Sequence, residues 1–252
     1  MIYNLLNKTI MSKGVEAMNL NSEQNKLNIL KDSKYVPEIK STLRGYMITL
    51  PKIIREASGI IINGKRIKSL LFSTDVAIIK NTNADAIIAV YPFTPQPLIT
   101  QALMMVSDVP IFCGVGGGIT QGKRVLNLAL DAEFKGAAGV VVNAPTSNDI
   151  IRGLKESIDI PVIVTIVSEK DSFAERINAG ATILNVSGGK NTAFIVKEIR
   201  EKFPNYPIVA TGGPTEKTIK ETILAGANAI TYTPPTSGKI FSELMMRYRS
   251  EY

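Results

Sequence analysis

Eight short apolar runs rich in β-branched residues recur from Ser69 onward, and a stretch with apolar residues at helical spacing follows each of them. Such runs are typical of buried strands, and their alternation with amphipathic helices is typical of a parallel sheet built from βα units. The runs are SLLFST from Ser69, AIIAVYP from Ala86, PIFCGVG from Pro110, GVVVNAP from Gly139, PVIVTIV from Pro161, ILNVSGG from Ile183, PIVATGG from Pro207 and AITYTPP from Ala229. We therefore predict eight parallel strands, the last of them followed by a helix in SGKIFSELMMRYRSEY.

These eight runs alternate between two kinds of start. Proline opens the third, fifth and seventh runs at Pro110, Pro161 and Pro207, a place where its missing N–H is tolerated. The small-residue turns KGAAG, NAGAT and LAGAN precede the fourth, sixth and eighth runs. A repeated two-strand module predicts an α/β fold that closes into a single (β/α)8 TIM barrel. An open doubly wound sheet is the alternative, but it normally shows edge strands of weaker apolar character.

The chain before the first run differs in composition. Residues 1–35 are rich in Asn, Lys, Ser and Glu, so we expect a poorly ordered N-terminal extension followed by the barrel over residues 36–252. Met18 is a candidate alternative start of the protein. Between Lys40 and Lys65, LPKIIREASGIII predicts a helix and a short strand or turn that plugs the N-terminal end of the barrel. A length of 252 residues, 45% of them hydrophobic, suits one barrel domain with a large core.

Composition and charge limit the cellular locations and the binding partners that we expect. No apolar stretch approaches the ~20 residues that span a bilayer, and the N-terminus lacks the features of a secretory signal, so we expect a cytoplasmic protein without membrane contact. The single cysteine, Cys113, lies in an apolar run, which indicates a packing role and excludes an intramolecular disulfide. The net charge of +7 comes from scattered Lys and Arg without a long basic stripe, so we expect anionic metabolites rather than nucleic acid as partners.

Polar residues gather where the predicted strands end. In a (β/α)8 barrel the C-terminal ends of the strands carry function, and alternate residues of each strand point inward. The inward set turns from aliphatic to polar near these ends, at Ser73, Asp75, Asn143, Thr165, Asn185, Ser187, Thr211, Thr231 and Thr233. Ser, Thr, Asn and Asp also favour helix N-caps, so the structural alternative is that each of them caps a helix. For the whole set we favour a ring that binds substrate, with Asn143 and Asn185 among its ligands.

Glycine-rich turns follow several of the same strands. Gly188-Gly189 in NVSGGKN and Gly212-Gly213 in ATGGPTEKTI each precede a predicted helix, where backbone N–H groups and the helix dipole favour an anion. In YTPPTSG, Thr233 and Thr236 add hydroxyl donors. Gly117, within the triple glycine of CGVGGGITQGKR, marks a second place of close backbone approach, although turns alone explain many such glycines. These loops predict a phosphate or carboxylate site.

The complete absence of histidine excludes Ser-His-Asp and Cys-His nucleophiles and histidine metal sites. Acid–base chemistry then falls to carboxylates, lysines or a tyrosine. Asp75 in FSTD is the first candidate for a general base or an oxygen ligand of a metal, and Lys190 for an anion contact or a Schiff base. Glu169 and Lys123 are second-rank candidates. Tyr91 and Phe93 in VYPFTP are candidates to stack on a ring or sugar.

The stretch ATGGPTEKTIKETILAGANAITYTPPTSG resembles the phosphate region of the aldolase-type, ribulose-phosphate-binding barrels. This resemblance implies that Gly212, Gly213 and Thr233 are phosphate ligands. Lys190 lies beyond its strand, so the resemblance does not imply aldolase chemistry. Over residues 35–252 the chain, including NTNADAIIAVYPFTP, VGGGITQGKR and NVSGGKNTA, is also similar to a bacterial barrel family labelled hydrolase.

Three functional hypotheses follow. The first is an enzyme of lyase or isomerase type that acts on a small phosphorylated or carboxylated metabolite through Asp75 and Lys190. The second is metal-assisted hydrolysis, for which Mg²⁺ would be held near Asp75 and Asn143; neither a serine nucleophile elbow nor a zinc cluster is evident. The third is a noncatalytic barrel that binds a metabolite. The predicted βα loops are short, which leaves a homo-oligomeric partner or the N-terminal extension to cover the site.

Overall fold

Eight parallel strands close into a barrel in the computed structural model, which describes residues 37, 39, 41–42 and 47–251. The barrel belongs to the unit Tyr46–Tyr252, and the extension expected over residues 1–35 lies outside the described residues. Neighbouring strands pair in the order β10-β3-β4-β5-β6-β7-β8-β9, so the last strand pairs with the first. The predicted (β/α)8 barrel is therefore confirmed, and the open sheet was the wrong alternative.

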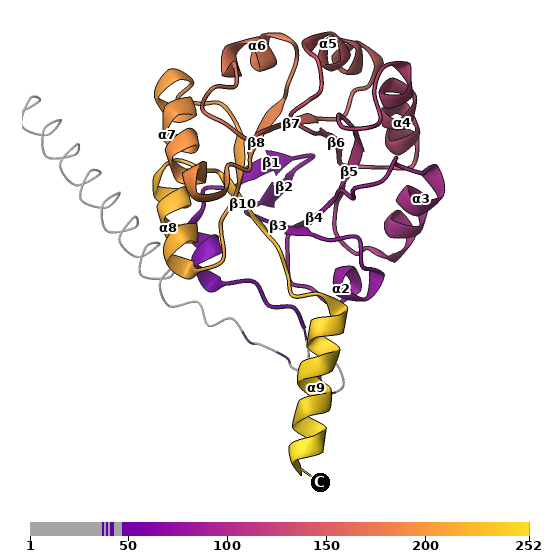
Figure 1. Ribbon diagram of the computed structural model, residues 1–252, viewed down its shortest axis with the longest axis vertical. Helices are drawn as coiled ribbons and strands as arrows, with labels where there is room; N and C mark the ends of the chain where they lie inside the picture. Colours follow the sequence, from indigo (N-terminus) through magenta and orange to yellow (C-terminus); the bar gives the residue numbers. More distant parts are fainter. Residues whose placement is uncertain (1–36, 38, 40, 43–46, 252) are drawn as a thin grey trace, which may run out of the picture. The chain divides into compact units, whose positions relative to one another are not determined.

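Each barrel strand is followed by an α-helix, and all but the last of these helices form a ring around the strands (Figure 1). The strands are β3 (Ser69–Phe72), β4 (Ala86–Ala89), β5 (Ile111–Gly116), β6 (Gly139–Val142), β7 (Val162–Ile166), β8 (Ile183–Val186), β9 (Ile208–Thr211) and β10 (Ala229–Tyr232). The helices are α2 (Val76–Lys80), α3 (Pro97–Val106), α4 (Lys123–Phe134), α5 (Asn148–Ser157), α6 (Phe173–Asn178), α7 (Thr192–Lys202), α8 (Glu216–Leu224) and α9 (Ser237–Glu251). A 3-10 turn, η2 (Gly189–Asn191), precedes α7.

The strands are mostly apolar, as expected where both faces of a sheet are buried, and their polar residues lie mainly toward their C-terminal ends. Inside the barrel, Leu70, Ile88 and Phe112 belong to an inner cluster to which the other strands also contribute. Outside it, Leu71 and Ile87 belong to a larger cluster that includes the inward faces of the helices. Alternate residues of one strand thus serve two different cores.

A β-hairpin packs against the inner cluster. Before it come the 3-10 helix η1 (Lys52–Glu56) and then strands β1 (Ile60–Ile62) and β2 (Lys65–Ile67), which pair antiparallel. Asn63 and Gly64, both with positive φ, form the two-residue turn that this connection favours. Ile60, Ile62 and Ile67 pack against the inner cluster. The predicted helix and short strand are present, although the helix is 3-10 and the strand belongs to a hairpin.

The last helix differs from the others. None of the residues of α9 is buried, and in Figure 1 the helix runs away from the ring of helices. Among the residues that the structure describes, no helix is long and apolar enough to cross a membrane.

Candidate functional site

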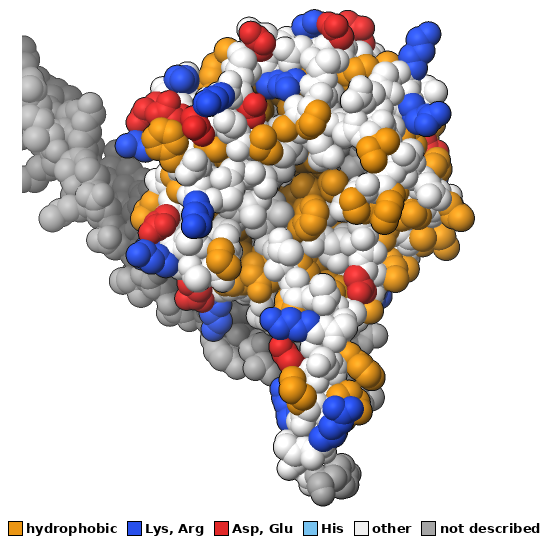
Figure 2. Space-filling model, viewed as in Figure 1, with side chains coloured by type: hydrophobic (Ala, Val, Ile, Leu, Met, Phe, Trp, Pro, Cys, Tyr) orange, Lys and Arg blue, Asp and Glu red, His pale blue; other side chains and the backbone are white. Residues whose placement is uncertain are grey.

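A cavity of about 250 Å³ opens at the C-terminal ends of the barrel strands, and we call it the central cavity. Its polar lining is a ring of amides and hydroxyls: Asn143, Thr165, Asn185, Ser187, Thr211, Thr231 and Thr233. Phe72, Ile88, Val90 and Val141 supply its apolar surface. All of these residues are uncharged. The barrel end visible in Figure 2 likewise carries its Lys, Arg, Asp and Glu side chains mainly toward the edge and on α9.

Two polar side chains of the central cavity are buried with unused hydrogen-bonding capacity. Asn185 is 8% exposed and Thr231 5% exposed. The amide nitrogen of Asn185 donates to Thr165 Oγ1 at 3.3 Å, but Asn185 Oδ1 and Thr231 Oγ1 have no partner within the described part of the chain. A buried polar group without a partner costs about 1–3 kcal/mol. An arrangement of this kind is expected where a ligand supplies the missing hydrogen bonds.

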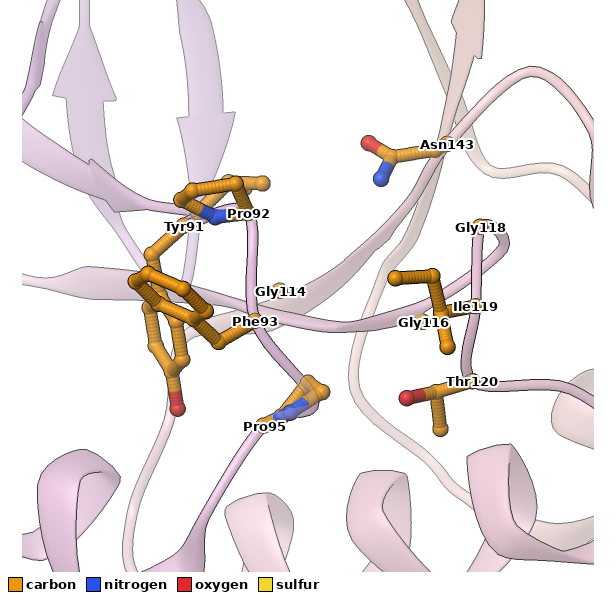
Figure 3. Close-up of a pocket in the computed structure, with 11 residues that line it drawn as sticks. Tyr91, Pro92, Phe93, Pro95, Gly114, Gly116, Gly118, Ile119, Thr120 and Asn143 are labelled. Carbon is orange, nitrogen blue, oxygen red and sulfur yellow. The ribbon is translucent and has the colours of Figure 1, made fainter.

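A smaller pocket of about 150 Å³, which we call the side pocket, adjoins the central cavity and shares Val90 and Asn143 with it. Figure 3 shows the residues that line it. They come from the β4–α3 loop, from β5 and the loop after it, and from the end of β6: Val90, Tyr91, Pro92, Phe93, Pro95, Gly114, Gly116, Gly118, Ile119, Thr120 and Asn143. Tyr91 and Phe93, the two stacking candidates, thus both belong to the lining of the side pocket.

A third pocket, of about 480 Å³, lies between the loops after β9 and β10, and we call it the β9–β10 pocket. Thr211, Thr231 and Thr233 line both this pocket and the central cavity. Gly213 lines it with φ +79, and Lys239 contributes an ammonium group. Of the proposed anion ligands, Gly213 and Thr233 therefore lie together beside a cation.

Asp75 lies at the start of α2, outside the lining of all three pockets. Its Oδ1 accepts hydrogen bonds from the backbone N–H groups of Ala77 and Ile78, and its Oδ2 accepts one from the Ser237 hydroxyl at 2.5 Å. The hydrogen bond from Ser237 and the two backbone hydrogen bonds lower the pKa of Asp75, against the opposing effect of desolvation. The structure therefore places Asp75 as the N-cap of α2.

Ser73 also departs from the predicted inward orientation. The inward residues at this end of β3 are Leu70 and Phe72, of which Phe72 lines the central cavity. Ser73 lies beyond the last residue of the strand, and its hydroxyl accepts a hydrogen bond from the Asp75 N–H. The expected alternation was wrong by one residue here.

The other ionisable candidates are exposed and line none of the three pockets. Lys190 lies in η2, Glu169 follows β7, and Lys123 is the first residue of α4. The structure does not bring Asp75 and Lys190 together around the central cavity. The described residues also contain no group of three His, Cys, Asp or Glu side chains that could hold a metal ion.

The predicted glycine turns differ in how their N–H groups are used. After β8, the Gly188 N–H donates to the Thr192 hydroxyl, which in turn donates to the Gly189 carbonyl. After β9, the Gly212 N–H donates to the Thr231 carbonyl. The N–H groups of Gly188 and Gly212 therefore hold the fold together in this structure, and Gly213 is the glycine that faces a pocket.

Two further candidates for anion binding, Gly117 and Thr236, make hydrogen bonds to the protein's own backbone. The Gly117 N–H donates to the Thr120 carbonyl, and its φ of +96 suits glycine. A Cβ at Gly117 would lie 2.0 Å from Thr146 Oγ1, which is too close for any side chain. Thr236 Oγ1 accepts from the Lys239 N–H in the first turn of α9. Sequence reasoning missed Phe72, Ile119, Thr120 and Lys239 as pocket residues.

No protein-family model matches this chain, and no curated protein sequence matches it either. Solved structures of similar fold include a phosphonopyruvate hydrolase, with a TM-score of 0.59 at 12% identity over 76% of this chain and 85% of that one. A 2,3-dimethylmalate lyase gives 0.55 at 14% identity over 85% and 87%. Thiamine phosphate pyrophosphorylase from Pyrococcus furiosus gives 0.51 at 17% identity over 66% and 84%. At these identities the likeness confirms the (β/α)8 barrel as the fold.

Proposed function

We propose that this chain binds a small metabolite with a carboxylate or phosphate end in the central cavity. The observation that supports this most directly is the pair of buried atoms without partners, Asn185 Oδ1 and Thr231 Oγ1, in residues that line the cavity. Amides and hydroxyls bind polar ligands in clefts by supplying a few oriented hydrogen bonds. The adjoining β9–β10 pocket, with Gly213, Thr233 and Lys239, is where we expect the charge of a phosphate to be held.

For the reaction we infer a lyase or an isomerase. Structures of similar fold include a 2,3-dimethylmalate lyase and an aldolase, which supports this class by analogy only. Because all side chains that line the central cavity are uncharged, proton transfer would fall to groups at its rim. Lys239 and Tyr232 of the β9–β10 pocket are the ionisable residues that border the threonines shared with the central cavity.

A second candidate function, noncatalytic binding of the same metabolite, is favoured by that uncharged lining. A receptor needs hydrogen bonds and shape, whereas acid–base catalysis needs an ionisable group within reach of the substrate. Asp75, which caps a helix, and Lys190, which is exposed, do not line the central cavity. The two candidates make the same binding prediction and differ in turnover.

A thermal-shift panel of keto acids, dicarboxylates and phosphorylated sugars, with and without Mg²⁺, tests the binding proposal. A ligand present at 100 times its dissociation constant stabilises the folded state by about 2.7 kcal/mol. Thr231→Val removes one hydroxyl from the central cavity and should reduce that stabilisation by about 0.5–1.5 kcal/mol, the contribution of one hydrogen bond. Thr222→Val is the matched control, because Thr222 is equally buried but bonds to the Thr218 carbonyl within α8. Equal ligand shifts in both variants would contradict the proposal.

Turnover of the ligands found in this panel separates the two candidates. The ligand is incubated with the protein and followed by NMR for bond cleavage or rearrangement. Product formation that is lost in Lys239→Met or Tyr232→Phe would support the lyase or isomerase. Tight binding without product, unchanged in Asp75→Asn and Lys190→Met, would support the noncatalytic barrel.

We also propose a cytoplasmic location, partners restricted to small molecules, and a homo-oligomeric assembly that helps to cover the cavity. Cell fractionation, a nucleic-acid binding assay and sedimentation of the full-length chain test these three points.

A further inference from the structure

The side pocket and the β9–β10 pocket adjoin the central cavity from different sides of the barrel. The residues of the side pocket come from β4, β5 and β6 and the loops after them, whereas the β9–β10 pocket lies after β9 and β10. In the closed order of the barrel, β9 is four strands away from β5 in either direction, so these two strands lie opposite each other. A ligand whose anionic end is bound beside Lys239 therefore points its other end toward the side pocket.

Two polar side chains face into the side pocket. Figure 3 shows the Thr120 hydroxyl directed into the space between the two loops, and the Asn143 amide facing the pocket from the end of β6. Thr120 is 5% exposed, and its Oγ1 has no hydrogen-bond partner within the described residues. A buried hydroxyl in this state is expected where a ligand supplies the missing partner. Asn143 also lines the central cavity, so a ligand there passes this amide on its way to Thr120.

The lining of the side pocket carries no charge. The described residues that line it include no lysine, arginine, aspartate or glutamate. Its one phenol, Tyr91, already accepts a hydrogen bond from the Gln96 N–H at 2.8 Å. A carboxylate or phosphate placed here would lose water without gaining a cation, which costs far more than the transfer of a hydroxyl or an amide that finds a hydrogen bond. The side pocket therefore suits a polar group without charge.

The loop that carries Thr120 is held in place without a ligand. The Gly117 N–H donates to the Thr120 carbonyl at 3.0 Å, a hydrogen bond that fixes the position of the hydroxyl in the pocket. At Gly116, φ is +146 and a Cβ would lie 2.7 Å from Val125 Cγ2, so only glycine allows this course of the loop. A hydroxyl that is already positioned loses little entropy when it binds a ligand.

From this geometry we propose that the ligand carries an uncharged hydroxyl or amide group at the end opposite its anion, and that this group binds in the side pocket to the Thr120 hydroxyl and the Asn143 amide. The volume of the side pocket, about 150 Å³, is that of a cavity that holds benzene, and so is ample for such a group. The proposal rests on the proposed function, because the anionic end is bound at the central cavity and the β9–β10 pocket. It excludes ligands that are charged at both ends.

Binding of three series of linear carboxylates, measured by ligand-observed NMR titration, tests this proposal. At each chain length from about four to eight carbons, the far end of the chain is a hydroxyl, a second carboxylate or a methyl group. At the length that binds best, we expect the hydroxy acid to bind about threefold or more tightly than the other two, the effect of one hydrogen bond. Thr120→Val should remove its advantage over the methyl compound. Thr222→Val, at a buried threonine that bonds within α8, is the control.

The outcomes distinguish this subsite from the central-cavity function. Equal affinity for hydroxy acids and methyl compounds at every length, tightest binding of the dicarboxylates, or equal effects of Thr120→Val and Thr222→Val would each overturn the subsite. If affinity still falls in Thr231→Val, the proposed function stands in all three cases. A preference for hydroxy acids that depends on Thr120, with affinity unchanged in Thr231→Val, would support the subsite and contradict the proposed function. Absence of binding by every compound would contradict both.

Discussion

Replacement of Asn185 by leucine should stabilise the free protein while it abolishes ligand binding. Leucine has the same branched outline as asparagine and lacks its polar atoms. Asn185 Oδ1 is buried without a partner, and removal of such an atom should raise the free energy of unfolding by about 1–3 kcal/mol. The change also removes the 3.3 Å hydrogen bond to Thr165 Oγ1, which is worth about 0.5–1.5 kcal/mol. Thr165 is partly exposed at the cavity, so its hydroxyl can bond to water instead.

The net expectation for Asn185→Leu is a gain of about 1 kcal/mol in the free energy of unfolding, which raises Tm by about 2–4 °C in a domain of this size. Urea denaturation followed by circular dichroism measures the free energy, and calorimetry measures Tm. Asn185→Leu should be more stable than the wild type only in the absence of ligand, because compounds that bind in the central cavity can no longer stabilise the variant.

Asn228→Leu is the matched control. The Asn228 Oδ1 accepts from the Ile208 N–H and from Arg200, both at 2.9 Å, and its amide nitrogen donates to Ser58. Because this amide makes three hydrogen bonds, its loss should destabilise the protein by about 3 kcal/mol. If Asn185→Leu instead lowered the free energy of unfolding by more than about 1 kcal/mol, Asn185 would be a structural residue like Asn228, and the reasoning would be refuted.

Three further predictions follow from the same structure. Gly117→Ala should lower the free energy of unfolding by about 2 kcal/mol or more, because Gly117 has a positive φ and a Cβ there would collide with Thr146. Gly118 has open space around it, so Gly118→Ala should change the free energy of unfolding by less than about 0.5 kcal/mol. Urea denaturation measures both. The pKa of Asp75 is lowered in the folded protein, so the stability that its carboxylate contributes is present above the unfolded pKa of 3.8 and is lost as the pH falls through the folded pKa. Asp75→Asn should therefore lose less stability than the wild type between pH 5 and 3. An equal fall in the free energy of unfolding of both proteins, measured by urea denaturation, would contradict this. Burial raises the pKa of Cys113 to about 12, so an aromatic disulfide reagent at pH 8 should react with it only after unfolding, and rapid reaction of the native protein would show that the thiol is accessible.

The apolar pattern alone was sufficient to predict the barrel. Each predicted strand is present, and Pro110, Pro161 and Pro207 lie directly before strands β5, β7 and β9. Strands that are buried on both faces leave an unambiguous run of β-branched residues, which loops and turns interrupt. The period of two then identified side chains such as Thr165 and Thr231, which do line the central cavity.

The same pattern was insufficient beyond the strand ends. Asp75 was assigned by extending the alternation past Phe72, where β3 stops, and its carboxylate instead caps α2. Ile119 and Thr120 belong to a loop whose course depends on positive-φ glycines and on hydrogen bonds across the turn, so no periodic signal marks them. No periodic pattern marks Lys239 either, because its position beside Gly213 depends on how the chain segments after β9 and β10 meet.

Residues of the two adjoining pockets should therefore respond differently to mutation. Asn185 and Thr231 lie on strands inside the packed barrel, so a change there alters the free energy of unfolding together with ligand binding. Phe93 and Ile119 lie on loops and are mostly exposed, so their truncation removes little from the folded core. The loops then set which ligands enter the side pocket, while the strands hold the common anionic group. Selectivity could then change through the loops at almost no cost in stability, whereas a gain in stability at the strands would come with a loss of binding.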